Sequence, residues 1–240
     1  MATTDPAALY PDVVAAGSLG ATLRAVAADE GPPFAESESD PLRQAAVASV
    51  VPHRTALTVS AWAAERRWSV RGCESFQGLA LVEGSTGDLT QIVRAARAWH
   101  DGTALDDIHR AAPFVHLTGR LDVTEPDPAR LAESEWRHLR TEAGEEERPG
   151  YHALIEAAYA EPALRGLYPF TSHGTLRFSG STRPRLTVVP VCLDAHPDGR
   201  YTVSAHYMGE VLVETTTAQE AVATAVQRLP SGLCPVAFGA

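Results

Sequence analysis

"LTVVPVCLDAHPDGRYTVSAHYMGEVLVETTTAQEAVATAVQRL", residues 186–229, is the stretch that decides the fold class. Three apolar segments are separated by turn residues, and the third is followed by a helical pattern. Thr217 and Glu220 have the spacing of a helix capping box. The order of three strands and a helix predicts an antiparallel β-meander with one face covered by that helix.

A similar order occurs earlier in the chain. "TALTVSAWAAERRWSVRG" and "GLALVEG" alternate with a period of two, and Thr86 is placed to cap the helix of "GDLTQIVRAARAW". "GLALVEGST" and "GEVLVETTT" align at Gly, Leu-Val-Glu and Thr, which indicates either an internal duplication or two strand-to-helix corners with the same capping need. The predicted fold class is α+β, with antiparallel β-meanders each followed by a covering helix. Two related ββα-type halves would then span residues 55–125 and 165–240.

The segment before these strands predicts helices. Ser18 is a suitable N-cap for a helix over residues 18–30, "GPPFAESESDP" resembles a flexible connector, and Asp40-Pro41 can open a second helix that ends at Pro52. We therefore expect an N-terminal helical arm and linker over residues 1–54 and an α+β domain over residues 55–240.

The region between the two meanders contains one further strand and one further helix. "PFVHLTG" predicts a strand, and residues 127–144 predict a helix that begins with Asp127 and Pro128. "EAGEEERPG" after this helix is typical of a solvated acidic loop.

The composition excludes several classes of protein. All 20 basic residues are arginine, so the chain can neither form a lysine Schiff base nor complete a Walker A loop. The formal net charge of −10 repels phosphate backbones and anionic membranes. We expect neither a nucleic-acid partner nor a membrane partner, and the sequence does not indicate an oligomeric state.

The cysteines and the first residues bear on the compartment. Cys73, Cys192 and Cys234 are odd in number and never in a CxxC spacing, which is typical of reduced thiols. Asp5 and Asp12 lie where a signal peptide needs positive charge, and no apolar run approaches the roughly 20 residues of a membrane span. We expect a soluble cytoplasmic protein.

Metal-binding patterns are present but have simpler explanations. His196-Pro197-Asp198 has the HxD spacing of an iron site, but it lies in "DAHPDGRY", whose Pro, Asp and Gly favour a hairpin turn. A second group could serve as the charged ends of two helices, and it comprises His100, Asp101, Asp106, Asp107 and His109. HExxH, GxSxG and GxGxxG motifs are absent from the sequence. We therefore expect no metal and no cofactor.

The segment "LYPFTSHGTLRFSG" is the strongest candidate for a site. His173 could act as a general acid or base, with Tyr168 or Ser172 as proton partner and Arg177 as an anion clamp. His116 of "PFVHLTG" is a second candidate for the wall of a pocket. If Ser172 and His173 both lie in a strand, their side chains point to opposite faces, which disfavours a direct Ser-His pair. The alternative is a structural strand, with His173 bound by a backbone carbonyl and Arg177 by a surface carboxylate.

Four segments carry a resemblance to a known family: "AEPALRGLYPFTSHGTLRFS", "RRWSVRG", "STGDLTQIVRAARAWHDGTALDDIHRAAPFV" and "TTAQEAVATAVQRLP". They resemble a domain-of-unknown-function family of GC-rich bacteria whose proteins are filed as natural product biosynthesis proteins. The similarity spans roughly residues 60–230. It implies membership of a specialised-metabolite gene cluster and supplies no catalytic residues. Gly174 stands where the family is expected to have an aromatic residue, so no role is assigned to this position.

Two hypotheses about function follow. The first is a cofactor-independent acid/base enzyme, or a binder of a small-molecule biosynthetic intermediate, acting in cyclisation, dehydration or isomerisation. The second is a non-catalytic accessory protein that binds a partner protein or a carrier-bound intermediate. A deep pocket with His173 or His116 on its wall would favour the first hypothesis, and a flat apolar face would favour the second.

Overall fold

The computed structural model describes residues 6–28 and 31–239, and Asp5 therefore lies outside the described residues. The structure is α+β with antiparallel sheets, so the predicted fold class is confirmed. The chain divides into two units, Met1–Thr118 and Gly119–Ala240, each with its own sheet and core. The boundary between the units lies inside the single domain that the sequence predicted over residues 55–240.

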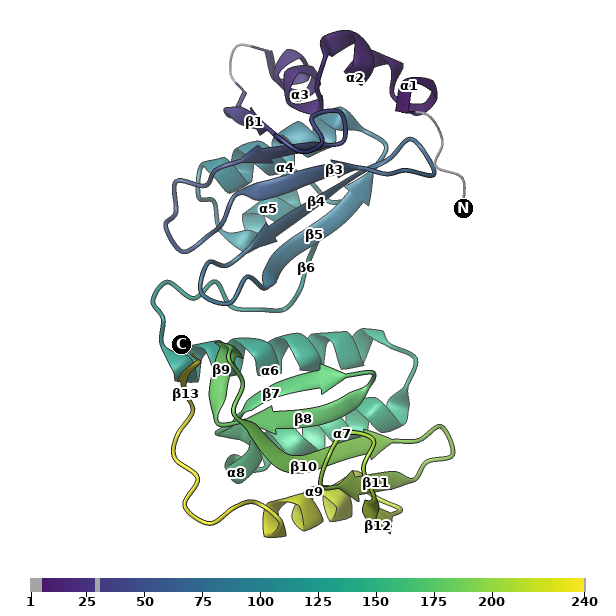
Figure 1. The fold of residues 1–240 in the computed structure, drawn as a ribbon, viewed down its shortest axis with the longest axis vertical. Helices are drawn as coiled ribbons and strands as arrows, with labels where there is room; N and C mark the ends of the chain where they lie inside the picture. Colours follow the sequence, from purple (N-terminus) through teal and green to yellow (C-terminus); the bar gives the residue numbers. More distant parts are fainter. Residues whose placement is uncertain (1–5, 29–30, 240) are drawn as a thin grey trace. The chain divides into compact units, whose positions relative to one another are not determined.

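The first unit is built on a six-stranded antiparallel meander in which every strand pairs with its neighbour in the sequence (Figure 1). Its strands are β1 (Phe34–Glu36), β2 (Gln44–Val47), β3 (Leu57–Ala61), β4 (Trp68–Cys73), β5 (Ala80–Thr86) and β6 (Val115–Leu117). The strand predicted in "PFVHLTG" is thus present as β6.

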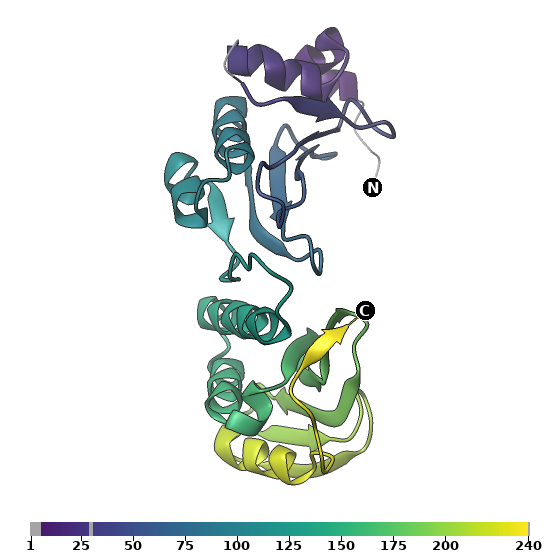
Figure 2. The same cartoon turned by 90° about the vertical axis from the view of Figure 1, so that its left-hand side faces the viewer.

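Helices cover one face of this sheet. The helices of the first unit are α1 (Pro6–Leu9), α2 (Pro11–Ala16), α3 (Leu19–Ala27), α4 (Leu89–His100) and α5 (Leu105–Ala111). Figure 2 shows α4 and α5 on one side of the strands. Ser18 accepts a hydrogen bond from the Ala21 amide, which confirms the predicted N-cap of α3, while residues 29–30 of the predicted helix lie outside the described part.

Two predictions for the N-terminal third were wrong. The predicted second helix over residues 40–52 is absent, since this segment forms a turn followed by β2, and the predicted flexible connector contains β1. Ala45 and Val47 alternate with more exposed residues because β2 pairs with β3, and this tertiary pairing overrides the helix propensity of an alanine-rich segment. The strands before residue 54 and those after it therefore belong to one sheet.

The N-terminal helices are fixed to the sheet by polar contacts. The Tyr10 hydroxyl lies 2.8–3.0 Å from the carbonyl oxygens of Trp62, Glu65 and Arg67, and its ring lies 5.6 Å from the Trp68 ring. These contacts hold α2 against the β3–β4 connection.

The second unit contains a five-stranded antiparallel sheet in the order β12-β11-β10-β8-β7. These strands are β7 (Tyr168–Ser172), β8 (Thr175–Ser179), β10 (Val188–Ala195), β11 (Tyr201–Ser204) and β12 (Val211–Thr215). A separate parallel pair joins β9 (Ser181–Pro184) and β13 (Ala237–Gly239).

Helices also cover one face of the second sheet (Figure 2): α6 (Pro128–Glu145), α7 (Pro149–Ala160), α8 (Pro162–Arg165) and α9 (Ala218–Gln227). The predicted start of α6 is confirmed because Asp127 accepts a hydrogen bond from the Ala129 amide. Thr217 likewise accepts from the Glu220 amide at the start of α9. The predicted acidic loop is shorter than expected, since α7 already begins at its Pro149.

In each unit, three consecutive antiparallel strands lead into a helix: β3, β4, β5 and α4 in the first, and β10, β11, β12 and α9 in the second. The connection between β5 and α4 differs from the prediction, because Asp88 rather than Thr86 caps α4. Cys73, Cys192 and Cys234 are free thiols. Within the described residues, no helix has the length and apolar character needed to cross a membrane.

Candidate functional site

The face of the first sheet opposite α4 and α5 is polar. Side chains alternate across the sheet, so Val59 and Val70 point into the core while their neighbours point away from it. The register places Arg71 opposite both Thr58 and Glu83, and Glu83 opposite His116. Four neighbouring strands, β3 to β6, thus bring one row of polar side chains together on this face.

A hollow of about 560 Å³ lies over this row. Arg71, Glu83 and His116 line it, with Ser69 and Ser85 in the adjacent row of the sheet. The rim is formed by the β3–β4 connection, which contributes Trp62 and Arg67. The hollow is therefore built by strand register.

The three charged or titratable side chains of the row are not neutralised by neighbours. Within the described residues, the side chains of Arg71, Glu83 and His116 make no hydrogen bond and no ion pair, and all three residues are exposed. Arg67 differs, because its guanidinium is bound by Glu65 at 2.8 Å and lies 5.4 Å from the centre of the Trp62 ring. The row can consequently offer all its polar groups to a ligand.

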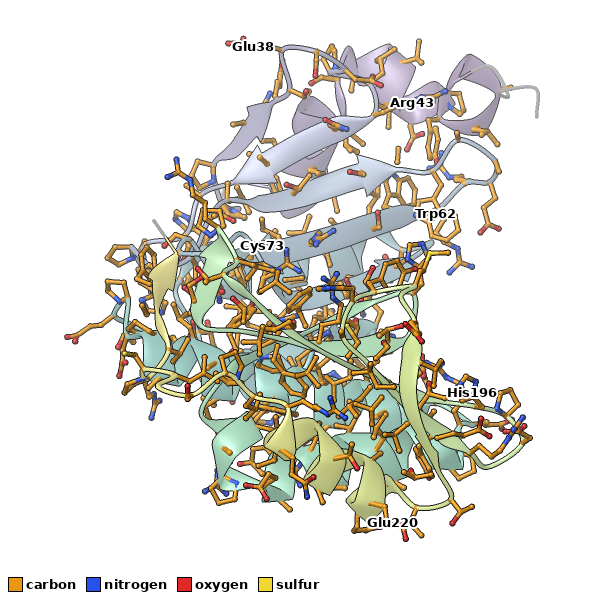
Figure 3. All side chains as sticks on the ribbon, turned by 60° about the horizontal axis from the view of Figure 1, so that its bottom comes forward. Glu38, Arg43, Trp62, Cys73, His196 and Glu220 are labelled. Carbon is orange, nitrogen blue, oxygen red and sulfur yellow. The ribbon has the colours of Figure 1, made fainter. Side chains whose placement is uncertain are left out.

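These groups have complementary chemistry. A guanidinium binds carboxylate or phosphate oxygens, a carboxylate can accept a proton, and an imidazole can donate or accept one. Trp62, labelled in Figure 3, is 41% exposed, so part of its indole can contact a flat ring even though the Arg67 guanidinium lies over this side chain. The hollow combines an anion clamp, an acid/base pair and an aromatic wall.

The segment predicted as the main site forms the β7–β8 hairpin. His173 and Gly174 both have positive φ values, 52° and 86°, and occupy the two-residue turn of that hairpin. His173 therefore does not lie in a strand, the condition under which its side chain would point away from that of Ser172, and its side chain is exposed at the hairpin tip. Because His173 lies in the turn, its Nδ1 is 3.4 Å from the Ser172 hydroxyl oxygen. This contact would be disfavoured if both residues lay in a strand.

Arg177 and Tyr168 lie farther along the same hairpin. Arg177 is directly opposite Phe170, and its side chain contacts that ring rather than a surface carboxylate of the described residues. Tyr168 is fully buried, and desolvation, assisted by the Glu135 carboxylate, raises the pKa of its phenol well above the ordinary value. A phenol in this state is a poor proton partner at neutral pH. His116 belongs to the other unit, away from the hairpin in the chain.

The histidines and aspartates of the two candidate metal patterns make local structural contacts instead. His196-Pro197-Asp198 forms the β10–β11 turn, as predicted: the Asp198 carboxylate accepts from the Arg200 amide, and Figure 3 shows His196 at the tip. His100 and His109 each contact a backbone carbonyl through Nδ1. Among the residues that the structure describes, no group of three or more His, Cys, Asp or Glu side chains could hold a metal ion.

Sequence reasoning found His116 but missed Arg71, Glu83 and Trp62. The signal was available in part, because Ser69 and Arg71 of "WSVRG" and the corresponding residues of "LVEGS" occupy the polar positions of two predicted strands. What was missing was the register, since alternation shows that residues share a face but not which of them are opposite one another.

Most of the second unit matches a known sequence family. Residues 130–240 match the model of a family of unknown function, DUF6193. The DUF6193 match begins within α6 and continues through both the five-stranded sheet and the β9–β13 pair, and it covers slightly less than half of the chain. The hollow of the first unit lies outside the DUF6193 region. No curated protein and no solved structure matches the sequence.

Proposed function

We propose that this protein binds a small polar molecule with an anionic group in the hollow of the first unit and transfers protons on it. The observation that carries the proposal is the row of Arg71, Glu83 and His116, whose side chains are adjacent, exposed and unpaired within the described structure. In a protein with a net charge of −10, an arginine and a carboxylate on adjacent strands that leave each other unpaired are well placed to bind a ligand.

The geometry suggests a division of labour. Directly opposite residues in an antiparallel pair have Cβ atoms about 4.5–5.5 Å apart, so Glu83 and His116 can both reach one small molecule. Glu83 would remove a proton from a carbon beside a carbonyl group, Arg71 would stabilise the resulting oxyanion, and His116 would deliver a proton to another atom. This sequence completes an isomerisation. Protonation of a leaving hydroxyl by His116 would instead complete a dehydration.

The biochemical context comes from the sequence resemblance. Similarity to natural product biosynthesis proteins supports a small-molecule intermediate of specialised metabolism as the ligand, and cyclisation, dehydration or isomerisation as the reaction. All three are within reach of groups that the chain itself supplies, and we therefore propose a cofactor-independent enzyme.

Binding can be tested before the substrate is known. The purified protein is incubated with a small-molecule extract of the source cells, and retained compounds are identified by mass spectrometry. The Arg71→Gln variant should retain at least about tenfold less ligand than the original protein, because the substitution removes a charge-assisted hydrogen bond to the anion. Arg43→Gln is the matched control, because Arg43 does not line the hollow and lies on the segment entering β2 (Figure 3). Equal retention by both variants would contradict the proposal.

One observation favours the alternative of a non-catalytic accessory protein. The edge strand β12 and the turn before it expose apolar side chains, with Met208 87%, Val211 52% and Leu212 38% accessible. Such an edge is suited to pairing with another protein. If Val211→Ser abolishes the biological activity of the protein while Arg71→Gln leaves it unchanged, the accessory function is the correct one.

A further inference from the structure

The second unit has a polar cluster of its own on the face of the sheet opposite the helices. Arg177 of β8 is opposite Phe170 of β7 on one side and Cys192 of β10 on the other. Leu176 and Phe178, its neighbours along the strand, point into the core beneath the helices. Arg177 therefore projects from the opposite face, on the strand next to the β7 edge and within the DUF6193 region.

Aromatic rings surround the Arg177 guanidinium. Its central carbon lies 5.0 Å from the centre of the Phe170 ring and 5.6 Å from the centre of the Tyr207 ring, which comes from the connection between β11 and β12. The Nε atom is buried and has no hydrogen-bond partner among the described residues. A guanidinium held by rings keeps its N–H groups in a fixed plane, which favours a planar, bidentate acceptor.

Arg177 differs from four other arginines of this unit in lacking an acidic partner among the described residues. Arg120, Arg140, Arg148 and Arg200 each form an ion pair with a glutamate or aspartate. Asp194, a carboxylate of the neighbouring strand β10, accepts a hydrogen bond from the Thr175 hydroxyl instead. Within the described residues, no carboxylate lies within ion-pair distance of Arg177.

The hairpin tip extends the aromatic surface next to this cation. The His173 ring stacks on the Tyr207 ring, with 5.8 Å between the ring centres and 21° between the planes. His173 is exposed, and its left-handed backbone conformation places the imidazole at the tip rather than along the strand. The ring surface and the guanidinium are therefore neighbours through Tyr207.

We propose that Arg177, Tyr207 and His173 form a second binding site, independent of the hollow in the first unit, for a carboxylate carried on a flat ring. Arg177 binds the two carboxylate oxygens, and the ring of the ligand packs against Tyr207 and His173. The ring requirement follows from the aromatic side chains, and the carboxylate requirement from the planar guanidinium, which has no carboxylate partner among the described residues.

The test is calorimetric titration of the full chain with benzoate, acetate and inorganic phosphate at constant ionic strength. Benzoate should bind more tightly than either of the other anions, because acetate lacks the ring and phosphate lacks the planar shape. Arg177→Gln should weaken the benzoate Kd at least about tenfold, the loss expected for a charge-assisted hydrogen bond. Tyr207→Leu should weaken benzoate binding and leave acetate binding unchanged.

Two controls separate this site from non-specific attraction and from the first unit. Arg185→Gln makes the same charge change at an exposed arginine elsewhere in the second unit and should leave the benzoate Kd unchanged. Arg71→Gln removes the proposed anion clamp of the hollow, and the benzoate binding that Arg177→Gln weakens should persist in this variant. Equal weakening by Arg177→Gln and Arg185→Gln, or loss of benzoate binding in Arg71→Gln, would overturn the proposal.

Discussion

Glu83 and His116 lie directly opposite one another on β5 and β6, on the face of the sheet that points away from α4 and α5. Both side chains are exposed, so neither contributes to the core. A carboxylate and an imidazole are brought together from positions 33 residues apart in the chain by one register pair, and the proposed proton transfer depends on this pairing.

Replacing either partner should separate activity from stability. Glu83→Gln and His116→Gln should each lower product formation by at least about tenfold, because a general acid or base contributes about 10²- to 10⁴-fold. Each variant should unfold within a few degrees of the original protein, since both positions are exposed and unpaired. Glu38→Gln is the matched control, because Glu38 is exposed on the β1–β2 connection (Figure 3). Variants that form product at the original rate would exclude the two residues from catalysis.

The ion pair between Asp12 and Arg66 should make the first unit sensitive to acid. Two hydrogen bonds of 2.8 Å from the Arg66 guanidinium hold the pKa of the Asp12 carboxyl below its ordinary value of 3.8. The pair therefore stabilises the folded chain above about pH 4, and this contribution is lost as the pH falls through the lowered pKa. Asp12→Asn should reduce the free energy of unfolding by at most about 1 kcal/mol at pH 7, because the pair is partly exposed.

Thermal unfolding of Asp12→Asn from pH 7 down to pH 3 checks this prediction. The difference between the variant and the original protein should shrink toward the acid end of the series. A difference that stays constant with pH would mean that the hydrogen bonds of Asp12, rather than its charge, hold α2 in place.

Gly72 should not tolerate a methyl group. A Cβ atom at this position would lie 2.6 Å from ring atoms of Trp99, which is fully buried in the core of the first unit. Gly72→Ala should therefore lower the free energy of unfolding by about 1–3 kcal/mol, the usual cost of overpacking. Gly87→Ala is the control, because the nearest atom to a Cβ at this position is a backbone oxygen 4.0 Å away. Its free energy of unfolding, measured by chemical denaturation, should be nearly unchanged. Equal stability of the two variants would contradict the packing of α4 on β4.

The sequence predicted the parts of the fold that local chemistry determines. Period-two alternation located β3, β4 and β5, and capping side chains located the starts of α3, α6 and α9. It failed at β2, where alanines favour a helix in isolation and pairing with β3 decides otherwise. The turn residues His196 to Gly199 were recognisable because Pro, Asp and Gly each have a specific turn preference.

The candidate sites were less predictable for a physical reason. His173 looked like a strand residue because Leu176 and Phe178 alternate behind it, but a histidine followed by glycine also fits the left-handed turn that the structure adopts. Arg71 and Glu83 attracted no attention individually, since charged residues on a strand are usually solvated. Their importance comes from being opposite one another, which depends on the register of two hairpins.

Fluorescence quenching of Trp62 tests the central claim most directly. The chain has four tryptophans, of which Trp68, Trp99 and Trp136 are at most 1% exposed, while Trp62 is 41% exposed on the rim of the hollow. Acrylamide quenching therefore reports mainly on this side chain, and the Trp62→Phe variant gives the baseline. The ligand retained in an Arg71-dependent manner should lower the quenching constant toward that baseline as it saturates the protein. Saturation by the same ligand with an unchanged quenching constant would show that it binds elsewhere and would contradict the assignment of the hollow as the functional site.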